Sequence, residues 1–297
     1  MRSLEGRVAV VAGGSRGAGR GIAVALGEAG ATVYVLGRTT RAGPAPGDGA
    51  PGTIEETAAE VSARGGTGLA VHADCTVAGE VAAAFERVTR EQGRVDVLAN
   101  AVWGAADAMK TLGDFTTAWS RPYWEQPVES WGGMMTSGPY AYWLTSWHAT
   151  RLMKAGGGGL IVGVTDGVFA AEGEPATDTG EGGGQLLWDL AHACINRLQK
   201  GMAAEARPHG IAVVTLMPGF MRTERVLMHV TTEEQAKMFG LDRSETPEYL
   251  GRAVAGLAAD PDVMGKSGRI HFVADLAREY GFTDVDGRQV PRFNPFG

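Results

Sequence analysis

A tryptophan and a histidine one helical turn apart are the first residues that suggest chemistry. Trp188 and His192 lie in the stretch WDLAHACINRLQK, which follows a glycine-rich segment and is expected to be a helix. Residues at positions i and i+4 share one helix face. An imidazole titrates near neutral pH, whereas an indole N–H donates a hydrogen bond without releasing its proton. The pair can shape a pocket and bind a hydroxyl, but Trp188 cannot act as an acid.

Asp166 adds a carboxyl group to this set, because it follows the apolar run GLIVGVT. A carboxyl group that is desolvated beside a ligand can act as a general acid near pH 7. If a protonated His192 approaches it, Asp166 instead stays ionised and suits a cationic substrate. An iminium ion carries its own proton, so its reduction needs a hydride and electrostatic stabilisation but no separate acid. The structural alternative is that Asp166 caps the following segment.

A glycine cluster near the N-terminus has the pattern of a phosphate-binding turn. Gly13, Gly17 and Gly19 lie in VAVVAGGSRGAG, between an expected strand and an expected helix. Glycines let the backbone approach a pyrophosphate, whose charge is met by the N–H groups at the start of the helix. Because the cluster follows a strand and opens a βαβ unit, it predicts dinucleotide binding.

The end of the second strand indicates which dinucleotide is bound. An acidic residue there would accept hydrogen bonds from a ribose hydroxyl, whereas an arginine would pair with a 2′-phosphate. The strand ends YVLGRTT, with Arg38 and no carboxylate, and Arg16 projects from the glycine turn. These two cations favour NADP(H), and the alternative for Arg38 is a solvated loop charge.

Short β-branched runs alternate with helical stretches along the chain, which is typical of right-handed βαβ units in a parallel sheet. We therefore expect an α/β fold with one doubly wound domain over residues 1–297. The expected strands lie at about 7–13, 32–38, 68–74, 95–100, 159–165, 211–219 and 268–274. Helices would cover both faces of this seven-stranded parallel sheet.

Loop insertions are expected near 41–52, 101–131 and 170–185, with a C-terminal extension near 275–297. All three loops follow strands, so they lie at the edge where open α/β sheets bind ligands. The second is rich in Trp, Phe and Tyr, which either pack within the loop or form the wall of a substrate pocket. The third is acidic and glycine-rich, and either is solvated or contributes to an anionic site.

Composition excludes several classes of partner. The 297 residues are 44% hydrophobic and 21% charged, and the net charge of −7 argues against a nucleic-acid-binding surface. No apolar run is long enough for a signal sequence or a membrane span, so a cytoplasmic protein is expected. The two cysteines, Cys75 and Cys194, are expected to be buried, with neither a disulfide nor a metal site.

Together these motifs resemble the short-chain dehydrogenase/reductase family over nearly the whole chain. GGSRGAG, HAD, ANA and LMPGFMRT carry the resemblance, and YWEQPVESW, LAADPDVMGKSGRI and AREYGFTDVDGRQV resemble one branch of it. The resemblance implies a Rossmann-type fold that forms a homodimer or homotetramer through the helices at 131–153 and 188–207. It implies cofactor contacts by Gly13, Ser15, Arg16, Gly17 and Gly19 (pyrophosphate), Arg38 (2′-phosphate), Asp74 (adenine), Asn100 (adjacent ribose), and Pro218, Gly219 and Thr223 (nicotinamide end).

The family's catalytic Asn, Ser, Tyr and Lys fall on Gly138, Asp166, Trp188 and His192, so all four positions depart from the pattern. In that family the Tyr gives a proton to the substrate as hydride arrives, and the Lys also holds the ribose. We therefore expect an atypical oxidoreductase that binds a hydrophobic small molecule, with His192 taking the place of the Lys. The alternatives are a catalytically silent NADP(H)-binding sensor or assembly protein, and an enzyme in which Tyr123 or Tyr140 supplies the acid.

Overall fold

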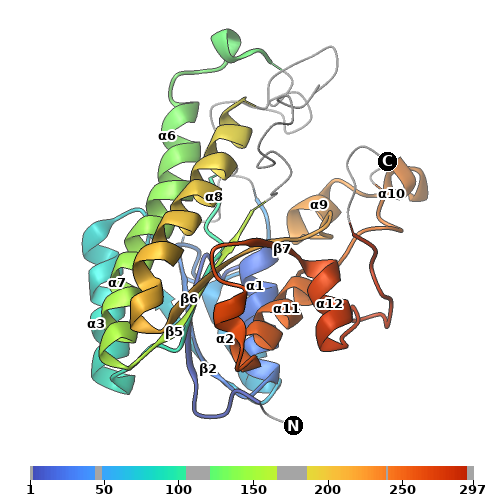
Figure 1. The fold of residues 1–297 in the computed structure, drawn as a ribbon. Coiled ribbons are helices and arrows are strands. Elements are labelled where there is room, and N and C mark those ends of the chain that lie inside the picture. Colours follow the sequence, from blue (N-terminus) through green and yellow to red (C-terminus); the bar gives the residue numbers. More distant parts are fainter. Residues whose placement is uncertain (1–2, 44–48, 105–120, 166–185, 239, 293–297) are drawn as a thin grey trace.

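Seven parallel strands form one sheet in a computed structural model that describes residues 3–43, 49–104, 121–165, 186–238 and 240–292 (Figure 1). The strand order is β3-β2-β1-β4-β5-β6-β7, so the expected doubly wound parallel sheet is confirmed. The strands are β1 (Val8–Ala12), β2 (Thr32–Gly37), β3 (Thr67–His72), β4 (Val97–Asn100), β5 (Gly159–Val164), β6 (Ile211–Met217) and β7 (Ile270–Phe272).

Helices cover both faces of the sheet, and alternate strand side chains pack against each layer (Figure 1). Val11 and Val35 pack with one set of helices, while Val10 and Tyr34 pack with the other. The first layer contains α1 (Gly17–Glu28), α2 (Ile54–Ala63), α11 (Pro247–Ala259) and α12 (Val273–Tyr280). The second contains α3 (Ala78–Gln92), α7 (Ala141–Ala155) and α8 (Leu186–Ala206). Burial on both faces explains the continuous apolar runs of the strands.

Two helix ends show how the sequence sets element boundaries. Thr53 caps α2 by accepting from the N–H of Glu56, whose carboxylate accepts in return from the N–H of Thr53. Gly93 ends α3 in the left-handed conformation, with φ of 70°.

Helix α11, which is absent from the expected elements, crosses α1 at close range. A Cβ atom at Gly21 would lie 2.1 Å from the carbonyl oxygen of Pro247, and one at Gly251 would lie 2.2 Å from the carbonyl oxygen of Gly21. The two glycines therefore let the helix backbones touch. This crossing fixes α1, and with it the glycine turn at its start.

The helix expected over 131–153 is interrupted. It consists of α6 (Ser130–Met135), a π-helical turn at Thr136–Tyr140 that contains Pro139, and α7. Proline has no N–H and its ring collides with the preceding turn of a regular helix, so the wider turn accommodates it.

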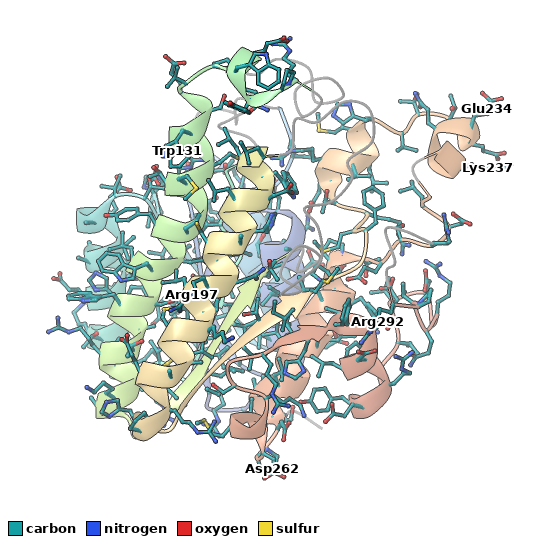
Figure 2. The ribbon with its side chains drawn as sticks, turned by 45° about the horizontal axis from the view of Figure 1, so that its top comes forward. Trp131, Arg197, Glu234, Lys237, Asp262 and Arg292 are labelled. Carbon is teal, nitrogen blue, oxygen red and sulfur yellow. The ribbon has the colours of Figure 1, made fainter. Side chains whose placement is uncertain are left out.

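Beyond β6 the chain forms two short helices, α9 (Glu224–Met228) and α10 (Glu233–Met238). Figure 2 shows Glu234 and Lys237 of α10 directed away from the rest of the molecule. Of the expected insertions, all of 170–185, residues 105–120 and residues 44–48 lie outside the described residues. Among the helices of the described ranges, none has the length and apolar character needed to cross a membrane.

Candidate active site

A cavity of about 520 Å³ opens at the carboxyl ends of the strands, where the strand order reverses between β1 and β4. One end lies at the glycine turn and the ends of β2 and β3. The other lies among aromatic residues that follow β4 and begin α8. Its lining includes Gly13, Ser15, Arg16, Gly17, Arg38, Asp74, Cys75, Ala101, Trp103, Tyr142, Thr165, Trp188, His192, Pro218, Gly219, Thr223 and Glu224.

The glycine turn is shaped to hold a dinucleotide. Gly13 and Gly17 have φ of 82° and 53°, which other residues rarely adopt. A Cβ atom at Gly19 would lie 2.1 Å from the carbonyl oxygen of Gly13, so the start of α1 packs directly on the turn. The first-turn N–H groups of α1 have no partner within the helix and attract negative charge. The sequence-predicted glycines therefore form a cradle that fits a pyrophosphate.

Arg16 reaches from this turn across the end of β2. Its Nε donates to the carbonyl oxygen of Pro51 at 3.1 Å, and Nη2 donates to Gly52 O at 2.9 Å and to Thr39 Oγ1 at 3.1 Å. The neighbouring Ser15 is buried against the cavity. The positive charge of Arg16 is thus held where the second strand ends.

Arg38 and Asp74 form an ion pair at the same end of the cavity. Nη1 of Arg38 lies 3.6 Å from Oδ2 of Asp74, and Arg38 is about half exposed. Oδ1 of Asp74 accepts from the N–H and the hydroxyl of Thr76, at 2.8 and 2.6 Å. The carboxylate therefore anchors the loop after β3 and also holds the guanidinium beside the cavity.

Asn100, expected to contact the ribose, points its side chain elsewhere. It is fully buried, its Oδ1 accepts from Thr145 Oγ1 at 2.6 Å, and its Nδ2 donates to Ser146 Oγ at 3.1 Å. Both partners lie on α7, so the amide joins β4 to that helix. In the described part of the cavity wall, the chain after β4 contributes through Ala101, Val102 and Trp103 instead.

The segment Pro218–Thr223 contributes to the cavity wall, and hydrogen bonds to Glu245 clamp it in place. Glu245 accepts from the N–H of Gly219 at 2.9 Å, and its backbone pairs with Phe220 and Arg222 at 2.9 and 2.8 Å. Thr223 accepts from the N–H of Val226 at 3.3 Å and so caps α9. The expected nicotinamide-end residues are therefore held in place by a residue that sequence reasoning did not identify.

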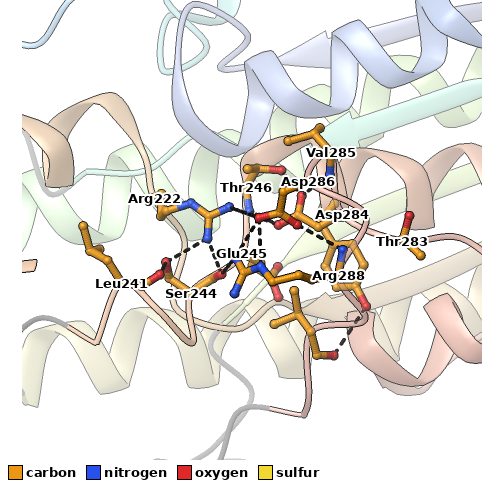
Figure 3. A network of polar contacts seen from close by, with 12 residues as sticks. Arg222, Leu241, Ser244, Glu245, Thr246, Thr283, Asp284, Val285, Asp286 and Arg288 are labelled. Atoms are coloured by element: carbon orange, nitrogen blue, oxygen red, sulfur yellow. Dashed lines mark hydrogen bonds and ion pairs between the residues drawn. The ribbon is translucent and has the colours of Figure 1, made fainter. Parts of the chain in front are cut away.

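Charges near the C-terminus support this clamp (Figure 3). Arg222 pairs with Asp284 and Asp286 at 3.3 and 3.4 Å, and Arg288 pairs with Asp286 at 2.8 Å. Burial raises the pKa of Glu245 to about 8, despite the Gly219 N–H, and the nearby Asp284 charge acts in the same direction. The clamp therefore contains a carboxyl group that favours its neutral form.

Three rings form the other end of the cavity. The Trp103 ring stacks on His192 with centroids 4.1 Å apart and meets Trp188 edge-on at 4.8 Å. A Cβ atom at Gly138 would lie 3.6 Å from Cζ3 of Trp103. Gly138, Trp188 and His192, which the sequence predicts at the family's Asn, Tyr and Lys positions, thus surround one indole. Its Nε1–H is buried and has no hydrogen-bond partner among the described residues.

His192 is buried, and its ring makes a contact within α8. Its Nδ1 lies 3.1 Å from the carbonyl oxygen of Trp188. A carbonyl oxygen only accepts, so Nδ1 is the donor of this hydrogen bond. The contact holds the imidazole of His192 against the preceding turn of α8.

Tyr142 is a phenol that the sequence did not single out. Its hydroxyl donates to the carbonyl oxygen of Val164 at 3.0 Å, and burial raises its pKa. Tyr123 and Tyr140, considered as replacement acids, are 63% and 38% exposed and do not belong to the described cavity wall. Asp166 lies outside the described residues, immediately after Thr165 of the cavity wall.

The cysteines differ from each other. Cys75 is buried beside the cavity, and burial raises the pKa of its thiol to about 12. Cys194, expected to be buried, is half-buried because it lies on the side of α8 that faces a second, outer hollow.

Comparisons with known proteins give a consistent result. A family profile described as enoyl-(acyl carrier protein) reductase matches residues 12–274. The chain is 35% identical over 306 residues to dehydrogenase/reductase SDR family member 1 of Mus musculus, covering 99% of this chain and 88% of that protein.

Two solved structures resemble the fold. A short-chain dehydrogenase from Mycobacterium thermoresistibile has a TM-score of 0.74 at 24% identity, covering 97% of this chain and 92% of the other. A 7α-hydroxysteroid dehydrogenase complexed with NADH and 7-oxo glycochenodeoxycholic acid has a TM-score of 0.69 at 22% identity, covering 91% and 93%.

Proposed function

The chain belongs to the short-chain dehydrogenase/reductase family of oxidoreductases, and we propose that it is an NADP(H)-dependent reductase of a hydrophobic small molecule. The hydride acceptor would be a C=N bond, or an activated C=O or C=C bond. The observation that carries this proposal is the continuous cavity, which joins the glycine turn to Trp103, Trp188 and His192. A protein that only senses a dinucleotide has no need of a cavity that extends from the glycine turn to these rings.

The preference for NADP(H) rests on charge at the end of β2. Arg38 and Arg16 place two guanidinium groups at this end, and no carboxylate follows the strand directly. A 2′-phosphate would compete with Asp74 for Arg38, which is exposed enough to turn toward it. Arginine suits this task because its fork of donors matches a phosphate.

The bound nicotinamide would supply or accept the hydride. The side chains of the cavity would hold the cofactor and position the substrate. His192 would hydrogen-bond a ribose hydroxyl, at the position where the family has its Lys. Trp188 and Trp103 would form an apolar floor for the substrate.

The described wall lacks a phenol that is ready to give up a proton, since Tyr142 donates to Val164 and its pKa is raised. This favours an iminium substrate, which brings its own proton. Indole faces attract cations, and Asp166 would add a negative charge next to Thr165. Together these features select a cationic, apolar C=N compound over a neutral ketone.

The test is NADPH consumption by the purified protein against cyclic imines and matched ketones. We expect turnover of the imines, and a loss of at least tenfold for Asp166→Asn. The double variant Trp188→Tyr/His192→Lys, which restores the family residues, should shift activity toward ketones. Asp166→Asn with full imine activity would refute the proposed role of Asp166.

The predicted replacement of the family's Tyr and Lys by Trp188 and His192 supports a second candidate, a catalytically silent NADP(H)-binding sensor or assembly protein. In that case the rings would close the reaction end. NADPH binding without turnover of any imine, ketone or enone would favour this function.

We also propose that the protein forms a homodimer or homotetramer through α7 and α8. Trp143 and Trp147 are 46% and 44% exposed on α7. Arg197 lies on the outer side of α8 and, with Trp143, lines the outer hollow next to Cys194 (Figure 2). Light scattering of the wild type and of Trp143→Glu would test this, because a charge there should favour the monomer.

A further inference from the structure

One carboxylate of the chain lies against the start of helix α1. The N–H of Gly17, the first residue of α1, donates to Oε2 of Glu224 at 2.7 Å. Oε1 of the same group lies 3.4 Å from Nη1 of Arg20, on the next turn of α1. Glu224 also belongs to the cavity wall. A protein anion thus uses a donor at the place where a cofactor anion is expected.

This placement creates a direct competition. The first-turn N–H groups of a helix bind a phosphate oxygen or a carboxylate for the same electrostatic reason. The single hydrogen of Gly17 N cannot be shared strongly between two anions. A carboxylate a few ångströms from a pyrophosphate would also repel it, because the shared donors only partly offset the two negative charges. Glu224 and a bound pyrophosphate therefore disfavour each other.

The fold presents Glu224 from a firmly held segment. Thr223, the preceding residue, caps α9, and a Cβ atom built on Gly17 would lie 3.5 Å from its methyl carbon. The segment before it is clamped by Glu245. In contrast, α9 itself is five residues long, has no buried residue and contributes Val226 to the cavity wall. Glu224 lies at the boundary between the held segment and this short helix.

We propose that Glu224 sets the affinity of the site for its dinucleotide. Without cofactor its carboxylate occupies the Gly17 N–H, and cofactor binding requires that it withdraw. This inference rests on the proposed dinucleotide binding and adds to it a residue that weakens binding.

The chain offers a matched control. Glu60 of α2 pairs with the same Arg20, with Oε2 at 2.6 Å from Nη2. It does not contact the described cavity wall or the N–H of Gly17. Removing Glu60 therefore perturbs Arg20 as strongly as removing Glu224 does, and leaves the start of α1 unchanged.

The experiment measures the Kd of NADPH and of NADH by calorimetry for the wild type, Glu224→Ala, Glu224→Gln and Glu60→Ala. We expect Glu224→Ala to bind both dinucleotides at least fivefold more tightly than the wild type. Glu224→Gln, which keeps an acceptor but loses the charge, should lie between them. Glu60→Ala should stay within twofold of the wild type. Melting temperatures show that each variant is folded.

Equal or weaker binding by both Glu224 variants, with measurable binding by the wild type, would overturn the inference and leave the proposed function intact. An equal gain for Glu60→Ala would also overturn it, because the cause would then be Arg20. If none of the four proteins binds either dinucleotide, the proposed function fails and this inference fails with it.

Discussion

The two ends of the cavity are built in different ways. At the cofactor end, the critical groups are backbone atoms: Gly13 and Gly17 adopt positive φ, and Gly19 packs on the carbonyl oxygen of Gly13. At the reaction end, the critical groups are large side chains, with the rings of Trp103, Trp188 and His192 in mutual contact. A site made of backbone tolerates almost no change of residue at its glycines. A site made of rings can change its chemistry while the sheet beneath it stays the same.

If the proposed function is correct, this contrast allows one cavity to keep a dinucleotide site while the side chains at its reaction end change. The glycine turn depends on β1 and α1, which are locked by the α1–α11 crossing. The ring cluster depends on the loop after β4, the π-helical turn and the start of α8. The π-helical turn and α8 belong to the second helix layer, whereas the loop after β4 approaches the turn: a Cβ atom at Gly13 would lie 2.8 Å from the backbone of Ala101 and Val102.

The largest effect is expected for Gly19→Ala. Its Cβ atom would lie 2.1 Å from backbone that cannot move without breaking the turn, so we expect a loss of at least about 3 kcal/mol in the free energy of unfolding. Dinucleotide binding should be lost as well. Denaturant titration and calorimetry measure both. Gly79→Ala, whose Cβ atom would meet nothing within 4 Å, should change stability by less than about 1 kcal/mol. If the Gly19→Ala protein is stable and binds the cofactor, the claim that the cofactor end tolerates no side chain at its glycines is wrong.

Trp103→Ala should act on the reaction end. It removes the ring contacts to Trp188 and His192, and we expect a loss of about 2 to 3 kcal/mol in stability. The Kd of NADPH should stay within about threefold of the wild type, while substrate turnover falls. Trp124→Ala is the control, because Trp124 is 72% exposed. A Trp103→Ala protein that loses cofactor binding would show that the two ends are coupled.

Glu245→Gln tests the clamp behind the cofactor end. Because the pKa of Glu245 is raised from 4.5 to about 8, the folded protein keeps a proton that the unfolded chain releases between these values. The wild type should therefore lose stability, on the order of 5 kcal/mol, as pH rises from 4.5 to 8. Glu245→Gln, which keeps an acceptor for Gly219, should lose less over this range. Denaturation at several pH values, with exposed Glu233→Gln as control, measures the difference. Parallel pH profiles for wild type and Glu245→Gln would contradict it.

The smallest effect concerns cofactor choice. Arg38→Ala should weaken NADPH binding about tenfold, the loss of one charge-assisted phosphate contact. NADH binding should change less than twofold, since NADH has no 2′-phosphate. Arg41→Ala, an exposed arginine shortly after β2, is the control. Equal losses for both dinucleotides would assign Arg38 to the Asp74 ion pair alone.

The fold and the cofactor end were largely predictable, because the signals are local. Buried parallel strands are continuous apolar runs. A glycine cluster between a strand and a helix is typical of a turn that binds phosphate groups. The same local signals could not show that Asn100 faces α7, since its partners Thr145 and Ser146 lie more than forty residues away. Local signals also could not show that the Tyr142 hydroxyl donates to Val164 of β5, or that Glu245 accepts from the N–H of Gly219.

The sequence by itself determined the order of the seven strands along the chain and the glycine turn between β1 and α1, and it predicts that Trp188 and His192 replace the family's catalytic Tyr and Lys. These depend on residue type and short-range spacing. Only the tertiary structure decided that the Trp103 ring packs on both of these side chains, that Glu245 holds Gly219 and that Glu224 meets Gly17. Each of these contacts joins segments that are distant along the chain, and their distance and orientation follow from how the layers pack on the sheet.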